Sequence, residues 1–158
     1  MPLPPPRRIT RLIALAIGIP FLVGLAVLTL SPVPVEDAAP DLLDTVLGAL
    51  HDDLGWTWAG FDTLEVLANI LVFVPVGALA FLLLPRRLWP LSFAVGPVLS
   101  LLIEAVQSAA LPGRTASLID VLANSAGATF GAAGALLIAS AFALRRAPGV
   151  PSPSLETP

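Results

Sequence analysis

This chain contains four long apolar stretches, and each has the length of a membrane-crossing helix. They cover approximately residues 12–30, 66–84, 88–111 and 118–144. A hydrocarbon core of about 30 Å takes roughly 20 helical residues to cross. Helices are expected, because in lipid every backbone amide must find its partner within its own segment. The pattern predicts an all-α fold: a polytopic integral membrane protein whose four transmembrane helices form one domain, residues 12–146.

The first apolar stretch is interpreted as a retained membrane anchor rather than a cleaved signal peptide. Arginines precede it, but its apolar run is longer than the roughly 7–15 residues usual in a signal peptide. The segment that follows, Ser31-Pro32-Val33-Pro34, offers no cleavage site of the small-x-small type. We therefore expect residues 12–30 to remain in the protein as its first span.

The basic residues predict how the helices are oriented. Apart from Arg114, they precede the first stretch, join the second to the third, or follow the fourth: Arg7, Arg8, Arg11, Arg86, Arg87, Arg145 and Arg146. With four spans these positions share one side of the membrane, which the positive-inside rule makes the cytoplasm. Both termini, residues 1–11 and 147–158, are then cytoplasmic, and the proline-rich second tail should be disordered. The acidic segment 31–65, which contains no arginine, is predicted to lie outside.

Part of this outer loop has the spacing of an amphipathic helix. Between residues 41 and 54, apolar positions recur on one helical face: Leu42, Leu43, Val46, Leu47, Leu50 and Leu54. Acidic side chains fall opposite them. Trp56 and Trp58 follow, and tryptophan is favoured at the level of the lipid headgroups. The pattern predicts a short helix lying on the outer leaflet.

The composition argues against a soluble protein, a nucleic-acid-binding protein and a metal site. Hydrophobic residues make up 56% of the chain and charged residues 12%, with a mean hydropathy of +0.91. In soluble proteins about a quarter of the residues are charged. No basic face exists to neutralise phosphates, so nucleic acid is not an expected partner. The chain has no cysteine and a single histidine, which excludes a thiolate metal site and a metal-binding pair of histidines. We expect no metal and no cofactor.

Charged and amide side chains recur inside the last three apolar stretches, where a charged group costs about 2.5–3.5 kcal/mol at the centre of a span. Each stretch, counted with Glu65 directly before the second one, has one carboxylate and one carboxamide three or four residues apart, which places both on one helical face. At about 1.5 Å of rise per residue, all of them lie in the outer third of the membrane, with Arg114 in the short loop above. They form the predicted ligand-binding set: Glu65, Asn69, Glu104, Gln107, Arg114, Asp120 and Asn124.

Below this polar layer the same helical faces carry small residues. Gly127 and Gly131 continue the polar line of the fourth stretch, at the spacing that lets helices approach closely. On the third stretch, Gly96 and Ser100 lie below Glu104. We expect the helices to pack tightly toward the cytoplasm and to open into a polar pocket toward the outside.

Two runs of residues carry a family resemblance. Residues 69–77 read NILVFVPVG, and a later run places polar and glycine residues at fixed intervals: Glu104, Gln107, Arg114, Asp120, Asn124, Gly127 and Gly131. The first run resembles the N-[IL]-x-x-F-x-P-x-G signature of the VanZ-like membrane protein family. The second is similar to that family's E-x-x-Q, R-x-x-D-x-x-D-x-x-x-N-x-x-G pattern in order and spacing. Ser117 departs from it, because relatives often carry aspartate at this position.

The resemblance covers about residues 62–144 and implies a place and a theme for the protein. The place is the bacterial cytoplasmic membrane, and the theme is the cell envelope. The family takes its name from a protein that lowers bacterial susceptibility to the glycopeptide teicoplanin, which implies a link to antibiotic resistance. The resemblance supplies no established reaction.

Three functions remain open. The first is binding of an amphiphile from the outer leaflet (a membrane lipid, a lipid-linked wall precursor or a lipoglycopeptide), with Arg114 holding a phosphate or carboxylate. The second is an intramembrane enzyme acting on a lipid-linked substrate, in which Glu104 is the general base, Asp120 orients it and Arg114 stabilises negative charge. The third is a structural or partner-binding helix bundle. The sequence does not decide whether the protein is an enzyme, nor its oligomeric state.

Overall fold

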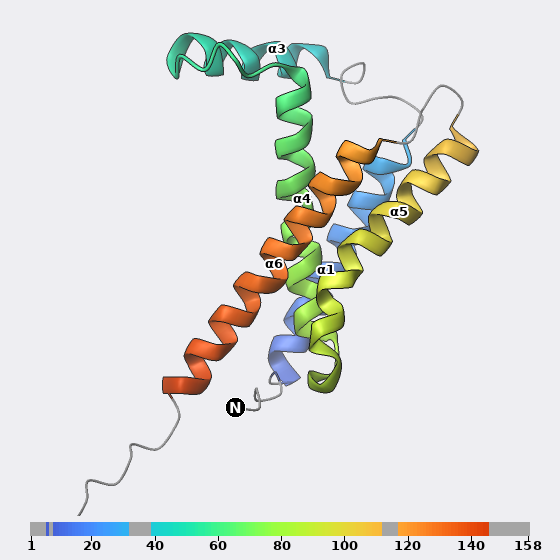
Figure 1. The fold of residues 1–158 in the computed structure, drawn as a ribbon, viewed down its shortest axis with the longest axis vertical. Helices are drawn as coiled ribbons and strands as arrows, with labels where there is room; N and C mark the ends of the chain where they lie inside the picture. Colours follow the sequence, from blue (N-terminus) through green and yellow to red (C-terminus); the bar gives the residue numbers. More distant parts are fainter. Residues whose placement is uncertain (1–5, 7, 32–38, 112–116, 146–158) are drawn as a thin grey trace, which may run out of the picture.

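The computed structural model describes residues 6, 8–31, 39–111 and 117–145, and every regular element in these ranges is a helix. Four helical segments are long and apolar enough to cross a membrane, which confirms the predicted all-α, four-span architecture (Figure 1). The elements are α1 (Arg8–Thr29), α3 (Pro40–Gly48), the π-helix η1 (Ala49–Asp53), α4 (Phe61–Leu83), the 3-10 helix η2 (Arg86–Leu91), α5 (Ser92–Ala110) and α6 (Leu118–Arg145). The tail predicted to be disordered, residues 147–158, and the predicted site residue Arg114 lie outside the described ranges.

α4 begins before the apolar stretch that marks it in the sequence. Its first residue is Phe61, whereas continuous apolar character starts at Val66. Asp62 lies in the first turn and favours this early start, because the positive N-terminal end of a helix dipole stabilises a carboxylate. At the rise of an α-helix, Asn69 is about 12 Å along the axis from the first residue of α4.

α4 lies at the centre of the bundle and contacts α6, α5 and α1. Buried side chains from α1, α4 and α6 meet in one apolar core: Leu25, Phe73, Val76 and Ala128. Partly buried side chains of α5 pack against this core. The outward faces of the spans keep many exposed leucine, isoleucine and valine side chains. Such faces are expected of helices that lipid rather than water surrounds.

α4 and α6 approach so closely that their backbones are in contact. A Cβ atom on Gly127 would overlap the carbonyl oxygen of Ile70, and one on Gly131 would overlap the carbonyl oxygen of Val74. Both glycines are buried. This agrees with their predicted role in packing, because glycine is the residue that lets two helices meet at this distance.

The two ends of the bundle differ in chemistry. α1 begins, η2 connects α4 to α5, and α6 ends at the same end of the molecule, which is the lower end in Figure 1. The described arginines all belong to these segments: Arg8, Arg11, Arg86, Arg87 and Arg145. We name this the arginine end. α3 lies at the opposite end (Figure 1), which we name the α3 end.

We expect reporter fusions to place the arginine end in the cytoplasm. A reporter joined at Pro148 should report the cytoplasm and one inserted near Asp37 should report the outside, because arginine-bearing segments are retained on the cytoplasmic side. A phosphatase that is active only outside and a fluorescent protein that matures only inside make the measurement. If both positions report the same compartment, the four-span topology is contradicted, and with it the common depth of the polar residues.

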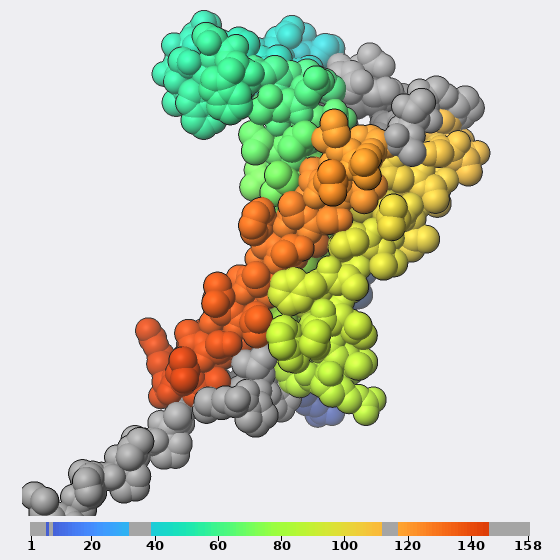
Figure 2. Space-filling model, viewed as in Figure 1, coloured from blue at the N-terminus to red at the C-terminus, as the bar shows by residue number. Residues whose placement is uncertain are grey.

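The helix predicted in the outer loop is present. α3 and η1 together cover residues 40–53, and they extend sideways from the start of α4 instead of lying along the spans (Figures 1 and 2). The chain then folds back on itself, since Nε2 of His51 donates a hydrogen bond to the carbonyl oxygen of Ala59 at 2.7 Å. Trp56 and Trp58 stack beside this turn, with ring centroids 5.8 Å apart.

Candidate functional site

Side-chain hydrogen bonds join α5, α6 and α4 in the half of the bundle toward the α3 end. Each bond links two different segments of the chain, and each involves a carboxylate or a carboxamide. The residues that make them form what we name the polar cluster: Asn69, Ser100, Glu104, Ser117, Asp120 and Asn124. The cluster therefore brings together the polar side chains of three spans, as the sequence predicted.

Ser117 defines the start of α6. Its carbonyl oxygen accepts the backbone N–H of Val121 at 3.2 Å, and its Oγ accepts the backbone N–H of Asp120, also at 3.2 Å. These are the bonds of a serine N-cap, which satisfies amide groups that a helix leaves unpaired at its first turn. The residues Ser117-x-x-Asp120 thus set where the fourth span begins.

Glu104 completes this cap from another helix. In a capping box, the side chain at the position of Asp120 would reach back to accept the N–H of the capping serine. Here Oε2 of Glu104 on α5 accepts the Ser117 N–H instead, at 2.8 Å. Oδ1 of Asp120 accepts Nδ2 of Asn69 on α4 at 3.0 Å. Glu104 therefore ties α5 to the start of α6, and Asp120 ties α6 to α4.

Asn124 lies one turn deeper in α6 and is only partly satisfied. Its Nδ2 donates to Oγ of Ser100 on α5 at 2.9 Å. Its Oδ1 is shielded from solvent and has no hydrogen-bond partner in the part of the chain that the structure describes. Buried polar atoms are almost always paired, so an unpaired amide oxygen at this depth requires an explanation.

Gln107 connects α5 to α1. Its side chain is buried, and Nε2 donates to the carbonyl oxygen of Thr29 at 2.6 Å. Thr29 is the last residue of α1, where helical carbonyl groups lack partners within the helix. Gln107 therefore fastens the end of α1 to α5.

The structure brings together four of the predicted ligand-binding residues. Asn69, Glu104, Asp120 and Asn124 are in the polar cluster, while Gln107 adjoins it through α1. Glu65 is exposed on α4, one turn toward the α3 end from Asn69.

Sequence reasoning missed Ser117 and Ser100 as members of the cluster. Ser117 had a local signal, because serine three residues before an acidic residue at the start of an apolar run is typical of a helix cap. Ser100 was placed on the correct face of its helix, but helical spacing does not say that Asn124 is its partner.

The match to known proteins agrees with this geometry. Residues 17–139 match the VanZ/LLP1 family, and this range contains the whole polar cluster. The chain belongs to the VanZ/LLP1 family. No curated protein and no solved structure compared with the chain matches it.

The family pattern has a physical interpretation in this VanZ/LLP1 protein. Its carboxylate and amide positions form the contacts between α4, α5 and α6, and its glycine positions let α6 lie against α4. Ser117 departs from the pattern, but serine and aspartate are both favoured N-cap residues. The departure therefore keeps the cap on α6 while removing one negative charge.

Proposed function

We propose that this VanZ/LLP1 protein binds the polar head of an amphiphile at the polar cluster, from the leaflet at the α3 end. The observation that supports this is the buried Oδ1 of Asn124, which has no partner among the described residues. Mutational data put the cost of burying an unpaired polar group at about 1–3 kcal/mol. A hydrogen-bond donor on a bound molecule removes that cost, so the atom is suited to receive a ligand.

The chemistry of the cluster favours a head group that donates hydrogen bonds. The carboxylates of Glu104 and Asp120 and the amide oxygen of Asn124 all accept hydrogen bonds, and the cluster as described contains no cation. An ammonium group or a set of hydroxyls complements such acceptors. Arg114 follows α5 in the sequence, and we infer that it holds a phosphate or carboxylate of the same ligand.

The family suggests where this binding has its effect. We place the protein in the bacterial cytoplasmic membrane, where lipids, lipid-linked wall precursors and lipoglycopeptides all join an apolar chain to a head rich in N–H and O–H groups. A ligand of this kind would link the protein to the cell envelope, and to glycopeptide susceptibility as the resemblance to the family's namesake implies. The apolar chain of the ligand stays in lipid along the exposed faces of the spans.

The purified protein is expected to retain phosphatidylethanolamine more strongly than phosphatidylcholine with the same acyl chains. The first carries N–H donors on its head and the second carries none, so only the first can satisfy Oδ1 of Asn124. Replacing Asn124 by leucine should remove this preference. Native mass spectrometry of the parent and the variant, titrated with each lipid in detergent, makes the measurement.

Thermal unfolding of the same proteins separates binding from structure. A residue kept for binding lowers stability in the absence of ligand, so Asn124→Leu with Ser100→Ala should unfold at the same temperature as the lipid-free parent or higher. Thr129→Val is the matched control, since among the described residues the Thr129 hydroxyl bonds only within α6, to the carbonyl of Ser125 at 2.8 Å. A parent that does not distinguish the two lipids, or a double variant of much lower stability, would make the cluster a structural link.

A further inference from the structure

Two arginines from different helical segments lie near each other at the arginine end. α1 packs against α4 near the arginine end, where a Cβ atom on Gly18 would touch the side chain of Leu79. Arg11 on α1 and Arg86, the first residue of η2, each lie seven residues from that contact toward the arginine end, so the two arginines lie at the same level of the bundle. Nε of Arg11 is shielded from solvent and has no hydrogen-bond partner among the described residues. Two guanidinium groups held together repel each other. An anion bound between them attracts both guanidinium groups and accepts a hydrogen bond from Nε of Arg11.

Phe81 contacts Arg86 through both its ring and its carbonyl group. Its guanidinium carbon lies 4.5 Å from the centroid of the Phe81 ring, and its Nη1 donates to the Phe81 carbonyl oxygen at 3.4 Å. Trp89 packs edge-on against Phe81, with centroids 6.4 Å apart. Tryptophan favours the headgroup level of a membrane, which places the neighbouring arginine at the depth of lipid phosphates.

The described carboxylates all lie away from this end of the molecule. They belong to α3, η1, the first turns of α4, and the polar cluster: Asp41, Asp44, Asp52, Asp53, Asp62, Glu65, Glu104 and Asp120. Within the described residues the arginine end is therefore a positively charged surface with no acidic side chain of its own. Its chemistry complements an anion that comes from outside the protein.

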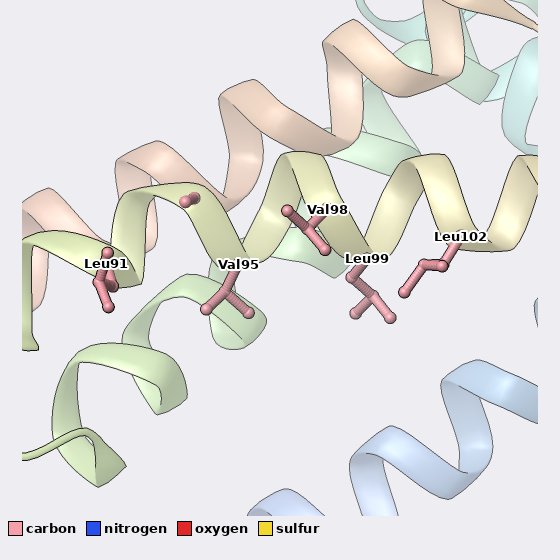
Figure 3. A pocket seen from close by; sticks show the side chains of 6 residues that line it. Leu91, Val95, Val98, Leu99 and Leu102 are labelled. Atoms are coloured by element: carbon pink, nitrogen blue, oxygen red, sulfur yellow. The ribbon is translucent and has the colours of Figure 1, made fainter.

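An apolar hollow of about 380 Å³ begins at Leu91, the last residue of η2, and continues along α5. It is lined by Leu91, Ala94, Val95, Val98, Leu99 and Leu102. Figure 3 shows Val95, Leu99 and Leu102 directed from α5 toward the side on which α1 lies. The eleven-residue step from Leu91 to Leu102 corresponds to about 16 Å along a helix, roughly half of the 30 Å hydrocarbon core. The hollow therefore has the depth of a single leaflet.

We propose that an anionic phospholipid binds at this place, in the leaflet at the arginine end. Its phosphate lies between Arg11 and Arg86, and one of its acyl chains lies in the hollow on α5. The positive charge of the arginine end attracts the anionic head group of the lipid. The length and apolar lining of the hollow match one of its acyl chains. This site is separate from the polar cluster and does not depend on the function proposed for it.

The test is titration of the purified full chain with phosphatidylglycerol and with phosphatidylcholine of the same acyl chains, followed by native mass spectrometry. The parent should retain phosphatidylglycerol at least about fivefold more strongly, the factor that corresponds to one arginine contact with an anionic lipid. Arg11→Gln and Arg86→Gln, made separately, should each remove most of this preference. Arg87→Gln is the matched control, because it makes the same change of charge at the exposed neighbouring position.

A second set of variants tests the place of the acyl chain. Val98 lines the hollow and is 55% exposed, so Val98→Trp fills the hollow without entering the core and should lower phosphatidylglycerol retention about fivefold. Leu101→Trp, at a similarly exposed position outside the hollow, should leave retention unchanged. Equal retention of the two lipids by the parent overturns the site, and so does an equal loss in Arg87→Gln. Unchanged retention in Val98→Trp overturns the placement of the chain.

Discussion

Replacing Gly131 by leucine is expected to prevent the spans from assembling into a stable bundle. Even a Cβ atom at this position would overlap the carbonyl oxygen of Val74 on α4. A backbone carbonyl that belongs to a helix cannot rotate away, so the two helices would have to separate. Overpacking of a well-filled core typically costs about 1–3 kcal/mol, and the expected loss is at or above the upper end of that range. Thermal unfolding in detergent, followed by circular dichroism, and the yield of monodisperse protein report the effect.

Gly134 provides the matched control on the same helix. It follows Gly131 by three residues, but a Cβ atom there would meet nothing within 4 Å. Gly134→Leu should therefore unfold at the temperature of the parent or slightly above, because leucine favours a helix more than glycine does. Equal losses in the two variants would show that α6 does not lie against α4 as described.

Replacing Glu104 by leucine is expected to release the start of α6 from α5. The Ser117 N–H, which Glu104 accepts at 2.8 Å, would then lose its partner at a part-buried position. A buried donor left unpaired costs about 1–3 kcal/mol. Glu104→Gln keeps a carbonyl oxygen of the same reach, so this variant should unfold at nearly the temperature of the parent. The difference between the two unfolding temperatures reports how much the hydrogen bond from Ser117 to Glu104 contributes to stability.

The glutamine variant also separates binding from catalysis. A carboxamide accepts hydrogen bonds but does not take up a proton as a general base. If the polar cluster binds an amphiphile, Glu104→Gln should retain the ligand that the parent retains. If Glu104 were a general base, the same variant would bind a lipid-linked substrate and leave it unreacted while the parent converted it. A leucine variant as stable as the parent would contradict the structural role of Glu104.

The spans, the outer-loop helix and the packing glycines could be predicted because they rest on local properties of the chain. Hydrophobic length decides whether a segment crosses a membrane, and the helical period decides which residues share a face. Asn124, Gly127 and Gly131 follow one another on such a face, and the structure buries all of them against neighbouring helices. The same reasoning placed the polar residues of three spans at one level, where hydrogen bonds now join them.

The choice of partners belongs to the tertiary structure alone. Gln107 on α5 binds the carbonyl of Thr29 on α1, and Asn69 binds Asp120, across separations of 78 and 51 residues. Helical periodicity says which way a side chain points on its own helix, but not which helix stands opposite. Which helix stands opposite is decided by the tertiary packing, in which α4 and α6 cross at their glycines and α1 docks on α4. This packing also brings Arg11 to the level of Arg86, because only the assembled bundle makes neighbours of residues that the chain keeps far apart.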